Sequence, residues 1–176
     1  MRNKIRLSFV TLFIFLFLLA SCGYRFSPGG EHIDKDIRTV YVDTFANRTS
    51  EANVENIFRN SFIDQFRKTS RFRVAETREE ADAVVRGSIN NLSSSHLSYA
   101  STDVAKEDRV TAVMDLVFEE RVSRKIIWSN TAFSWYGDYA VSSTNPSTTE
   151  SNKRSALSKL ADDFADRAFR MMMSGF

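Results

Sequence analysis

The chain has 176 residues, of which 43% are hydrophobic and 26% are charged, with a formal net charge of +2 and one cysteine. This composition is typical of a globular domain and excludes a disordered chain, and the length favours one domain. One cysteine excludes an intramolecular disulfide, and the near-neutral charge argues against a nucleic-acid-binding protein.

The first 21 residues have the organisation of a secretory signal peptide. Arg2, Lys4 and Arg6 precede an uncharged run over 7–20 that is rich in Phe and Leu and ends in small residues. Signal peptides have this order, and the run is shorter than the roughly 20 apolar residues of a spanning helix. We therefore expect 1–21 to be cleaved. The alternatives are an uncleaved anchor, or a signal peptide whose cysteine is incidental.

The motif Leu19-Ala20-Ser21-Cys22 closes this segment as a lipobox, which directs cleavage before the cysteine and its acylation. Leu19, Ala20 and Ser21 form the recognition part, and Cys22 is the expected attachment site for acyl chains such as palmitate. A free thiol is unexpected in an exported protein, and a thioether at Cys22 removes it. Two or more acyl chains give stable membrane attachment. Cleavage takes three of 24 basic residues and leaves 21 against 22 acidic ones.

A tether and a β-α-β unit are predicted for the first half of the mature chain. Residues 22–36 have no periodic pattern and contain Pro28, Gly29 and Gly30, which indicates a tether. Alternation predicts strands over 38–45 and 83–92, and a short extended piece near Phe72 is also compatible with the pattern. Apolar residues at steps of three and four predict a helix over 53–68: Val54, Ile57, Phe58, Phe62 and Phe66.

A hairpin and a helix are predicted for the second half. The Ser-rich segment 93–108 indicates a long loop or a frayed hairpin. Strands are expected over 109–121 and 125–136, joined by a turn at Ser123-Arg124. One face of the first is apolar throughout: Val110, Ala112, Met114, Leu116 and Phe118. Strict alternation in the second sets Phe133 and Trp135 on the side opposite Trp128. After a loop over 137–146, a capping box at 147–150 opens a helix that runs to about Met173.

These elements predict a single α+β domain over 37–176, in the order β-α-β-β-β-α. Two one-sided helices should cover one mixed four-stranded sheet as a two-layer sandwich. The first helix is a crossover, so the strands over 38–45 and 83–92 should be parallel. The connections 46–50, 93–108 and 137–146 should then gather at the end opposite the tether. Polar loops that converge are a natural surface for a partner or ligand.

The sequence contains no recognisable catalytic or metal site. His32 and His96 lack convergent ligands and are interpreted as exposed, solvated side chains. The acids Glu119 and Glu120 are neighbours in a strand, so they face opposite sides and cannot act together. We therefore expect no enzyme, no cofactor and no bound metal.

Two groups of basic residues are candidates for binding the phosphate or carboxylate groups of a glycolipid. The turn set surrounds the predicted hairpin turn and consists of Arg121, Arg124 and Lys125. The loop set lies near the predicted loop end and consists of Arg48, Lys106 and Arg109. For both sets the alternative is that the charges only protect an exposed turn or sheet edge from pairing.

The sequence resembles the LptE family of lipopolysaccharide-assembly lipoproteins, and most closely its Bacteroidetes branch. The resemblance rests on the Cys22-Gly23-Tyr24-Arg25-Phe26 start, on the strand and turn over 40–49, and on the order of elements. It implies a lipoprotein at the periplasmic face of the outer membrane that plugs an LptD-like outer-membrane β-barrel and binds lipopolysaccharide. The family's basic ligand residues have no matched positions here, so the two basic sets rest on charge alone.

A plug role agrees with the composition, because a barrel lumen is polar and suits a core-held domain of mixed surface charge. The competing hypothesis is a periplasm-facing lipoprotein of another export machine, of the curli-secretion or auxiliary transport type. The sequence leaves open the final membrane sorting, the contact residues and the oligomeric state.

Overall fold

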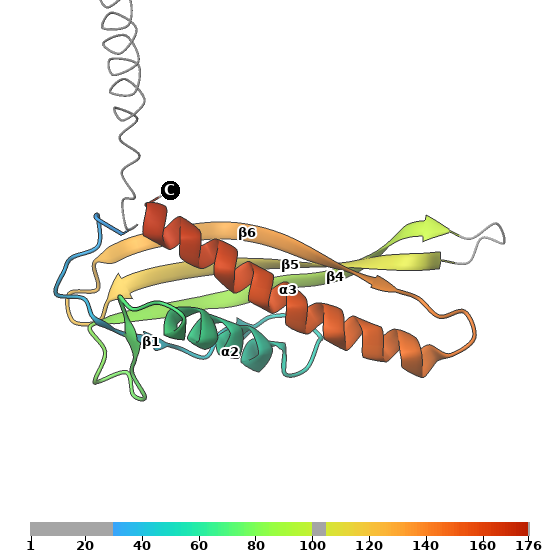
Figure 1. Ribbon diagram of the computed structural model, residues 1–176, viewed down its shortest axis with the longest axis horizontal. Coiled ribbons are helices and arrows are strands. Elements are labelled where there is room, and N and C mark those ends of the chain that lie inside the picture. The colour runs from blue at the N-terminus through green and yellow to red at the C-terminus, as the bar shows by residue number, and fades with distance from the viewer. Residues whose placement is uncertain (1–29, 100–104, 176) are drawn as a thin grey trace, which may run out of the picture.

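The computed structural model describes residues 30–99 and 105–175, so the lipobox and Cys22 lie outside the described residues. Helices α2 and α3 lie on one face of a long, twisted sheet (Figure 1). The predicted two-layer α+β arrangement is confirmed. The elements are β1 (Thr39–Val42), β2 (Ala46–Asn47), α2 (Val54–Arg67), β3 (Arg73–Val74), β4 (Ala83–Tyr99), β5 (Ala105–Glu120), β6 (Ile126–Ala140) and α3 (Pro146–Ser174).

The sheet is mixed, as predicted, but it has six strands instead of four. Its order is β3-β1-β4-β5-β6, and β2 pairs with β4. Strand β1 runs parallel to β4, with Val40 opposite Ala83, and the β4–β5 and β5–β6 pairs are antiparallel. Of the two extra strands, β3 is the short extended piece that the sequence allowed near Phe72, whereas β2 has two residues, too few for a periodic pattern to mark.

Of the two interpretations of the Ser-rich segment 93–108, the hairpin is confirmed and the long loop is wrong, because β4 and β5 continue through most of it. Ser93 lies opposite Thr111, and Ser95 lies opposite Arg109. Strand β5 keeps its alternation, so it supplies a partner strand along which the weakly patterned serines can pair. Pairing with a neighbour outweighs low intrinsic strand propensity. For the same reason β6 continues to Ala140, and the connection before α3 is shorter than the predicted 137–146.

A β-bulge in β6 overturns the predicted strict alternation of that strand. Met114 lies opposite Phe133 and Leu116 lies opposite Asn130, so two residues of β6 face the single residue Asp115. The bulge turns Trp128 and Phe133 onto the same face, where both are buried. Its second residue, Ala132, has φ of 55°, and its N–H donates to Asp115 Oδ1 at 2.9 Å. This hydrogen bond lowers the pKa of Asp115, and Asn90 contributes in the same direction.

Phenylalanine rings join the helices to the sheet. Phe58 on α2 packs edge-on against Phe164 on α3, with ring centroids 5.3 Å apart. Phe164 also meets Phe133 of β6, at 4.6 Å. The predicted helix over 53–68 and the apolar face of β5 are both confirmed. The five β5 residues predicted to share that face are at most 1% exposed: Val110, Ala112, Met114, Leu116 and Phe118.

Helix α3 begins one residue before the predicted capping box. Its N-cap is Asn145, whose side chain accepts a hydrogen bond from the N–H of Ser147 at 3.1 Å. Proline at the first helical position suits this start, because its missing N–H has no partner there in any helix. The capping box at 147–150 is therefore wrong, and Glu150 instead pairs with Arg154 at 3.2 Å. The helix ends close to its predicted end, at Ser174.

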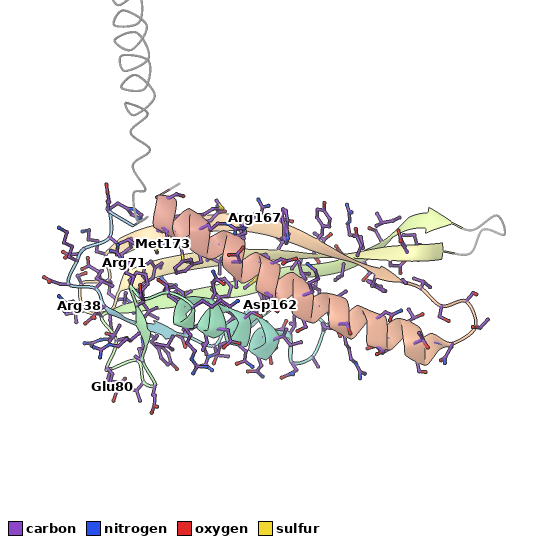
Figure 2. All side chains as sticks on the ribbon, in the orientation of Figure 1. Arg38, Arg71, Glu80, Asp162, Arg167 and Met173 are labelled. Carbon is purple, nitrogen blue, oxygen red and sulfur yellow. The ribbon has the colours of Figure 1, made fainter. Side chains whose placement is uncertain are left out.

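The described part of the predicted tether, 30–36, lies against the end of the domain. Ile33 is 2% exposed, and Gly30 approaches Arg71 and Met173 so closely that a Cβ would lie 2.8 Å from the Arg71 guanidinium. Figure 2 shows Arg71 and Met173 at this end of the molecule. The Ser123-Arg124 turn is at the same end, since Val122 and Ser123 line a hollow with Asp34, Asp36 and Ile37.

The three connections expected to converge do not form one surface. The backbone N–H of Arg48 donates a hydrogen bond to the Ile89 carbonyl of β4, and β4 continues from Ile89 to Tyr99. Ten further residues of strand measure about 33 Å. The β4–β5 hairpin therefore extends far beyond the 46–53 connection. The loop before α3 lies at the same end of the molecule as this hairpin, because β6 ends at Ala140, which pairs with Glu107 of β5 (Figure 1). Two of the three connections therefore lie at the end opposite the tether, as predicted, and the length of the hairpin separates only the 46–50 connection from them.

Candidate functional site

The face of the sheet opposite the helices carries charged side chains. Strand β5 sends its even-numbered apolar residues toward α2 and α3, so its odd-numbered residues face away. Among these, Asp115 and Glu119 neighbour Arg86 and Ser88 of β4 through the strand register. This helix-free face is a candidate contact surface.

Glu119 is the centre of an ion-pair network on this face. It is 2% exposed, and its carboxylate lies 3.0 Å from Arg86 and 3.2 Å from Arg124. The hydrogen bond from Arg86 lowers the pKa of Glu119, although burial opposes this shift, and the charge of Arg124 adds to it. Sequence reasoning treated Glu119 only as one of two adjacent acids. Its arginine partners come from β4 and from the turn, so only the strand register reveals the network.

The turn set is gathered at the β5–β6 turn, as expected from its sequence. Each member has a partner within the protein. Arg121 Nε donates to the Ala81 carbonyl at 2.6 Å, Arg124 pairs with Glu119, and Lys125 lies 3.7 Å from Glu120. The side chains of Arg124 and Lys125 are nevertheless 57% and 73% exposed, so an anionic ligand could reach both charges.

The loop set is not gathered. Arg48 lies beside Asn90, 3.4 Å from its side-chain oxygen. Arg109 belongs to β5 opposite Ser95, about 20 Å farther along the sheet. Lys106 is part of β5, and its side chain lies outside the described residues. Arg109 also binds Asp138 through two nitrogens, at 2.7 and 2.9 Å, and covers the Tyr136 ring at 3.6 Å.

His96 lies on β4 instead of in a loop, and it is paired. Its Nδ1 is 2.5 Å from Asp108 Oδ1, and Tyr139 donates a hydrogen bond to the other oxygen of that carboxylate at 3.3 Å. The His96 side chain is 57% exposed, as predicted, but its pairing was missed, because only the register of β4 and β5 brings Asp108 beside it. Among the described residues, no group of His, Cys, Asp and Glu has an arrangement that could hold a metal ion. Nor does any described helix have the length and hydropathy needed to span a bilayer.

The lowered pKa values of Glu119 and Asp138 predict a loss of stability in acid. The hydrogen bond from Arg109 lowers the pKa of Asp138, as that from Arg86 lowers the pKa of Glu119. Carboxyls whose pKa is lower in the folded state stabilise it above their unfolded pKa values, about 4, and lose this effect as pH falls through the folded values. The urea concentration at the unfolding midpoint should therefore stay constant between about pH 7 and pH 5. At pH values below about 4 it should decrease.

Glu119→Gln should lower the unfolding free energy at neutral pH by about 1–3 kcal/mol, because it leaves two arginines without their anion. The substitution should also make the unfolding free energy decrease less as the pH is lowered. Glu150→Gln is the matched control, since the Glu150–Arg154 pair is exposed and should contribute little. If the unfolding free energy decreases equally with falling pH in Glu119→Gln and in the unchanged chain, this role for Glu119 is contradicted.

Three solved structures share the fold. Lipoprotein B from Nitrosomonas europaea is 10% identical with a TM-score of 0.55, over 79% of this chain and 84% of that one. Rare lipoprotein B from Shewanella oneidensis is 12% identical with a TM-score of 0.51, over 77% of this chain and 95% of that one. A lipoprotein from Caulobacter crescentus is 9% identical with a TM-score of 0.53, over 75% and 89%. At such identities the likeness establishes the fold alone.

No curated protein sequence matches the chain. The family of the chain is assigned by a family model instead. Residues 37–172 match the model described as lipopolysaccharide-assembly, LptE. The match begins just before β1 and ends inside α3, so it includes all six strands and both described helices. The chain therefore belongs to the LptE family of lipopolysaccharide-assembly proteins.

Proposed function

We propose that this lipopolysaccharide-assembly protein acts as the lipid-anchored plug and partner of an LptD-type β-barrel, at the periplasmic face of the outer membrane. The observation that carries the proposal is the family match over 37–172, which covers nearly all of the folded domain. Proteins of this family are not enzymes, so the function lies in binding and positioning.

The surface of the domain supports a plug role. A barrel lumen is polar, so a plug needs a dry core of its own and a surface of mixed charge. Here the phenylalanines lie between the helices and the sheet. The helix-free face alternates acids and bases, with Arg86 beside Glu119 and Arg109 beside Asp138. Such paired charges can contact the polar wall of a barrel without giving this face a large net charge of one sign.

The position of the chain start supports anchoring at one end of the domain. If Cys22 carries the acyl chains, eight residue steps separate it from Gly30, and they can span at most about 28 Å. Gly30 lies against the end of α3, beside Met173, and this end also contains the Ser123-Arg124 turn. Anchoring through Cys22 would therefore keep this end near the bilayer and direct the β4–β5 hairpin away from it.

For lipopolysaccharide itself, we favour the turn set over the loop set. Arg124 and Lys125 are adjacent and largely exposed, whereas Arg48 and Arg109 are far apart. Several cations close together can bind the phosphates of one glycolipid head group. The internal partners Glu119 and Glu120 would compete with the ligand, which favours weak and reversible contact.

Affinity purification from detergent-solubilised outer membrane tests the proposal. The tagged full chain should recover a large β-barrel of the LptD type in near-equal amount, together with lipopolysaccharide. Mass spectrometry of the same sample should find an N-terminal peptide that begins at acylated Cys22. An unrelated outer-membrane lipoprotein with the same tag is the control and should recover neither.

Two results would count against the proposal. Recovery of no LptD-type barrel would remove the plug role. Recovery of components of another secretion system instead would favour the alternative, a lipoprotein of the curli-secretion or auxiliary transport type.

A further inference from the structure

Strand β6 forms the long open edge of the sheet. It has 15 residues and ends the strand order, so no described strand pairs with its outer side. The other border is different. There β3 has only two residues, and Arg59 Nε donates to the Val42 carbonyl of β1. An edge strand directs half of its backbone donors and acceptors outward, where another strand can pair with them.

The sequence of β6 lacks the usual protection of such an edge. From Ile126 to Gly137 it contains no charged residue and no proline, in a chain of which 26% of residues are charged. Soluble proteins commonly protect an exposed edge with lysine, proline or a very short strand. The bulge at Ala132 disturbs the edge locally, but the strand from Phe133 onward is regular. Its single charge, Asp138, is neutralised by Arg109.

A groove follows this part of the edge, between β6 and α3. It consists of two hollows of about 280 and 320 Å³, which share Asp138, Ala156 and Lys159 in their walls. Gly137 brings the strand close to the helix, since a Cβ there would lie 3.3 Å from the Ala156 carbonyl. At the far end the Asn152 side chain donates to the Ala140 carbonyl at 2.9 Å, which closes the edge there.

The side chains around the groove are held in place. Arg167 projects from α3 and covers the Trp135 ring at 3.6 Å (Figure 2). Tyr136 stacks on Trp135, and Arg109 covers the Tyr136 ring at 3.6 Å. Lys159 pairs with Asp163. The groove therefore presents an uncharged strand edge with neutralised charges at its rim, which matches an uncharged partner better than an anionic or a cationic one.

We propose that the edge of β6 from Phe133 to Asp138 binds an extended, uncharged polypeptide segment, which adds a further strand to the sheet and lies in the groove beside α3. Strand addition next to a helix uses the backbone for affinity and the pockets for alternate side chains. The six residues of this edge measure roughly 20 Å of strand, so a segment of about six residues pairs with them. The segment belongs to the barrel partner, so this inference rests on the proposed function.

Site-specific photo-cross-linking tests the geometry. A benzophenone amino acid replaces Ser134 or Tyr136 in the full chain, in cells that contain the barrel. Both positions should cross-link to one partner segment, at sites two residues apart, as paired strands require. Ser129, on the same strand before the bulge and outside the groove, is the control and should not reach that segment. Cross-links only to a second copy of this chain would overturn the proposal.

A pair of serine substitutions on α3 tests the groove. Ser155→Arg places a long side chain in the hollow, whereas Ser158→Arg makes the same change on the same helix outside the two hollows. We expect Ser155→Arg to lower barrel recovery at least about tenfold, or roughly 1.4 kcal/mol of binding free energy, and Ser158→Arg to leave it unchanged. Both variants should keep the unfolding midpoint of the unchanged chain.

The outcomes separate this inference from the proposed function. If the unchanged chain recovers no barrel, the proposed function has failed. If the barrel is recovered equally with Ser155→Arg, and Ser134 and Tyr136 yield no cross-link to it, the function stands and strand addition at β6 is wrong.

Discussion

Replacing Phe164 by alanine is expected to lower the free energy of unfolding by about 3–5 kcal/mol, a large share of a typical domain's total. The ring is fully buried and contacts Phe58 of α2 at 5.3 Å and Phe133 of β6 at 4.6 Å. Both helices and the edge strand meet at this one side chain. Its loss would leave a cavity between three rigid elements, which could not all move in to fill it.

Urea unfolding followed by circular dichroism measures the Phe164→Ala effect. Phe169→Ala is the matched control, on the same helix five residues later. Phe169 is only partly buried and packs edge-on against Phe66 at 5.2 Å, so its loss should cost clearly less. Equal losses for the two variants would mean that Phe164 does not join the layers as described.

Replacing Gly87 by alanine should also destabilise the fold strongly, by about 3 kcal/mol or more. A Cβ at this position of β4 would lie 2.2 Å from the Asp115 carbonyl oxygen of β5. That oxygen belongs to the backbone, so the clash can be relieved only if the two strands separate. Separation would also disturb the nearby bulge, where Ala132 depends on the Asp115 carboxylate.

Gly137→Ala is the control for Gly87→Ala, because it makes the same change in another strand of the sheet. There the Cβ would lie 3.3 Å from a carbonyl of α3, a distance that a small shift of the helix can relieve. We expect a loss of about 1 kcal/mol or less for Gly137→Ala in the same urea experiment. A Gly87→Ala protein as stable as the unchanged chain would show that β4 and β5 are not so close at Asp115.

Periodic patterns predicted the parts of the fold that bury a continuous face. The spacing of Val54, Phe58, Phe62 and Phe66 defines α2 within one residue at each end. The patterns failed where a neighbouring strand decides the structure. Nothing local distinguishes the serines of 93–99 from a loop, and only the partner β5 makes them a strand.

The candidate site was less predictable than the fold. Clustering of Arg121, Arg124 and Lys125 follows from their positions around one turn. The Glu119 network and the His96–Asp108 pair could not be predicted, because each depends on which residues of two strands face one another. If the extent of one strand is predicted wrongly, none of the residue pairs that it forms with the neighbouring strand can be predicted.

The strand pairing also sets an order of assembly. Strands β4, β5 and β6 are sequential neighbours, so they can pair as soon as the hairpin turns form, with little entropy of loop closure. Pairing of β1 with β4 must bring Val40 to Ala83 across a whole helix. The helix that covers β6 and packs on α2 is the last element of the chain. Because α3 is the last element of the chain, the apolar face of the sheet stays uncovered until the whole chain is available for folding.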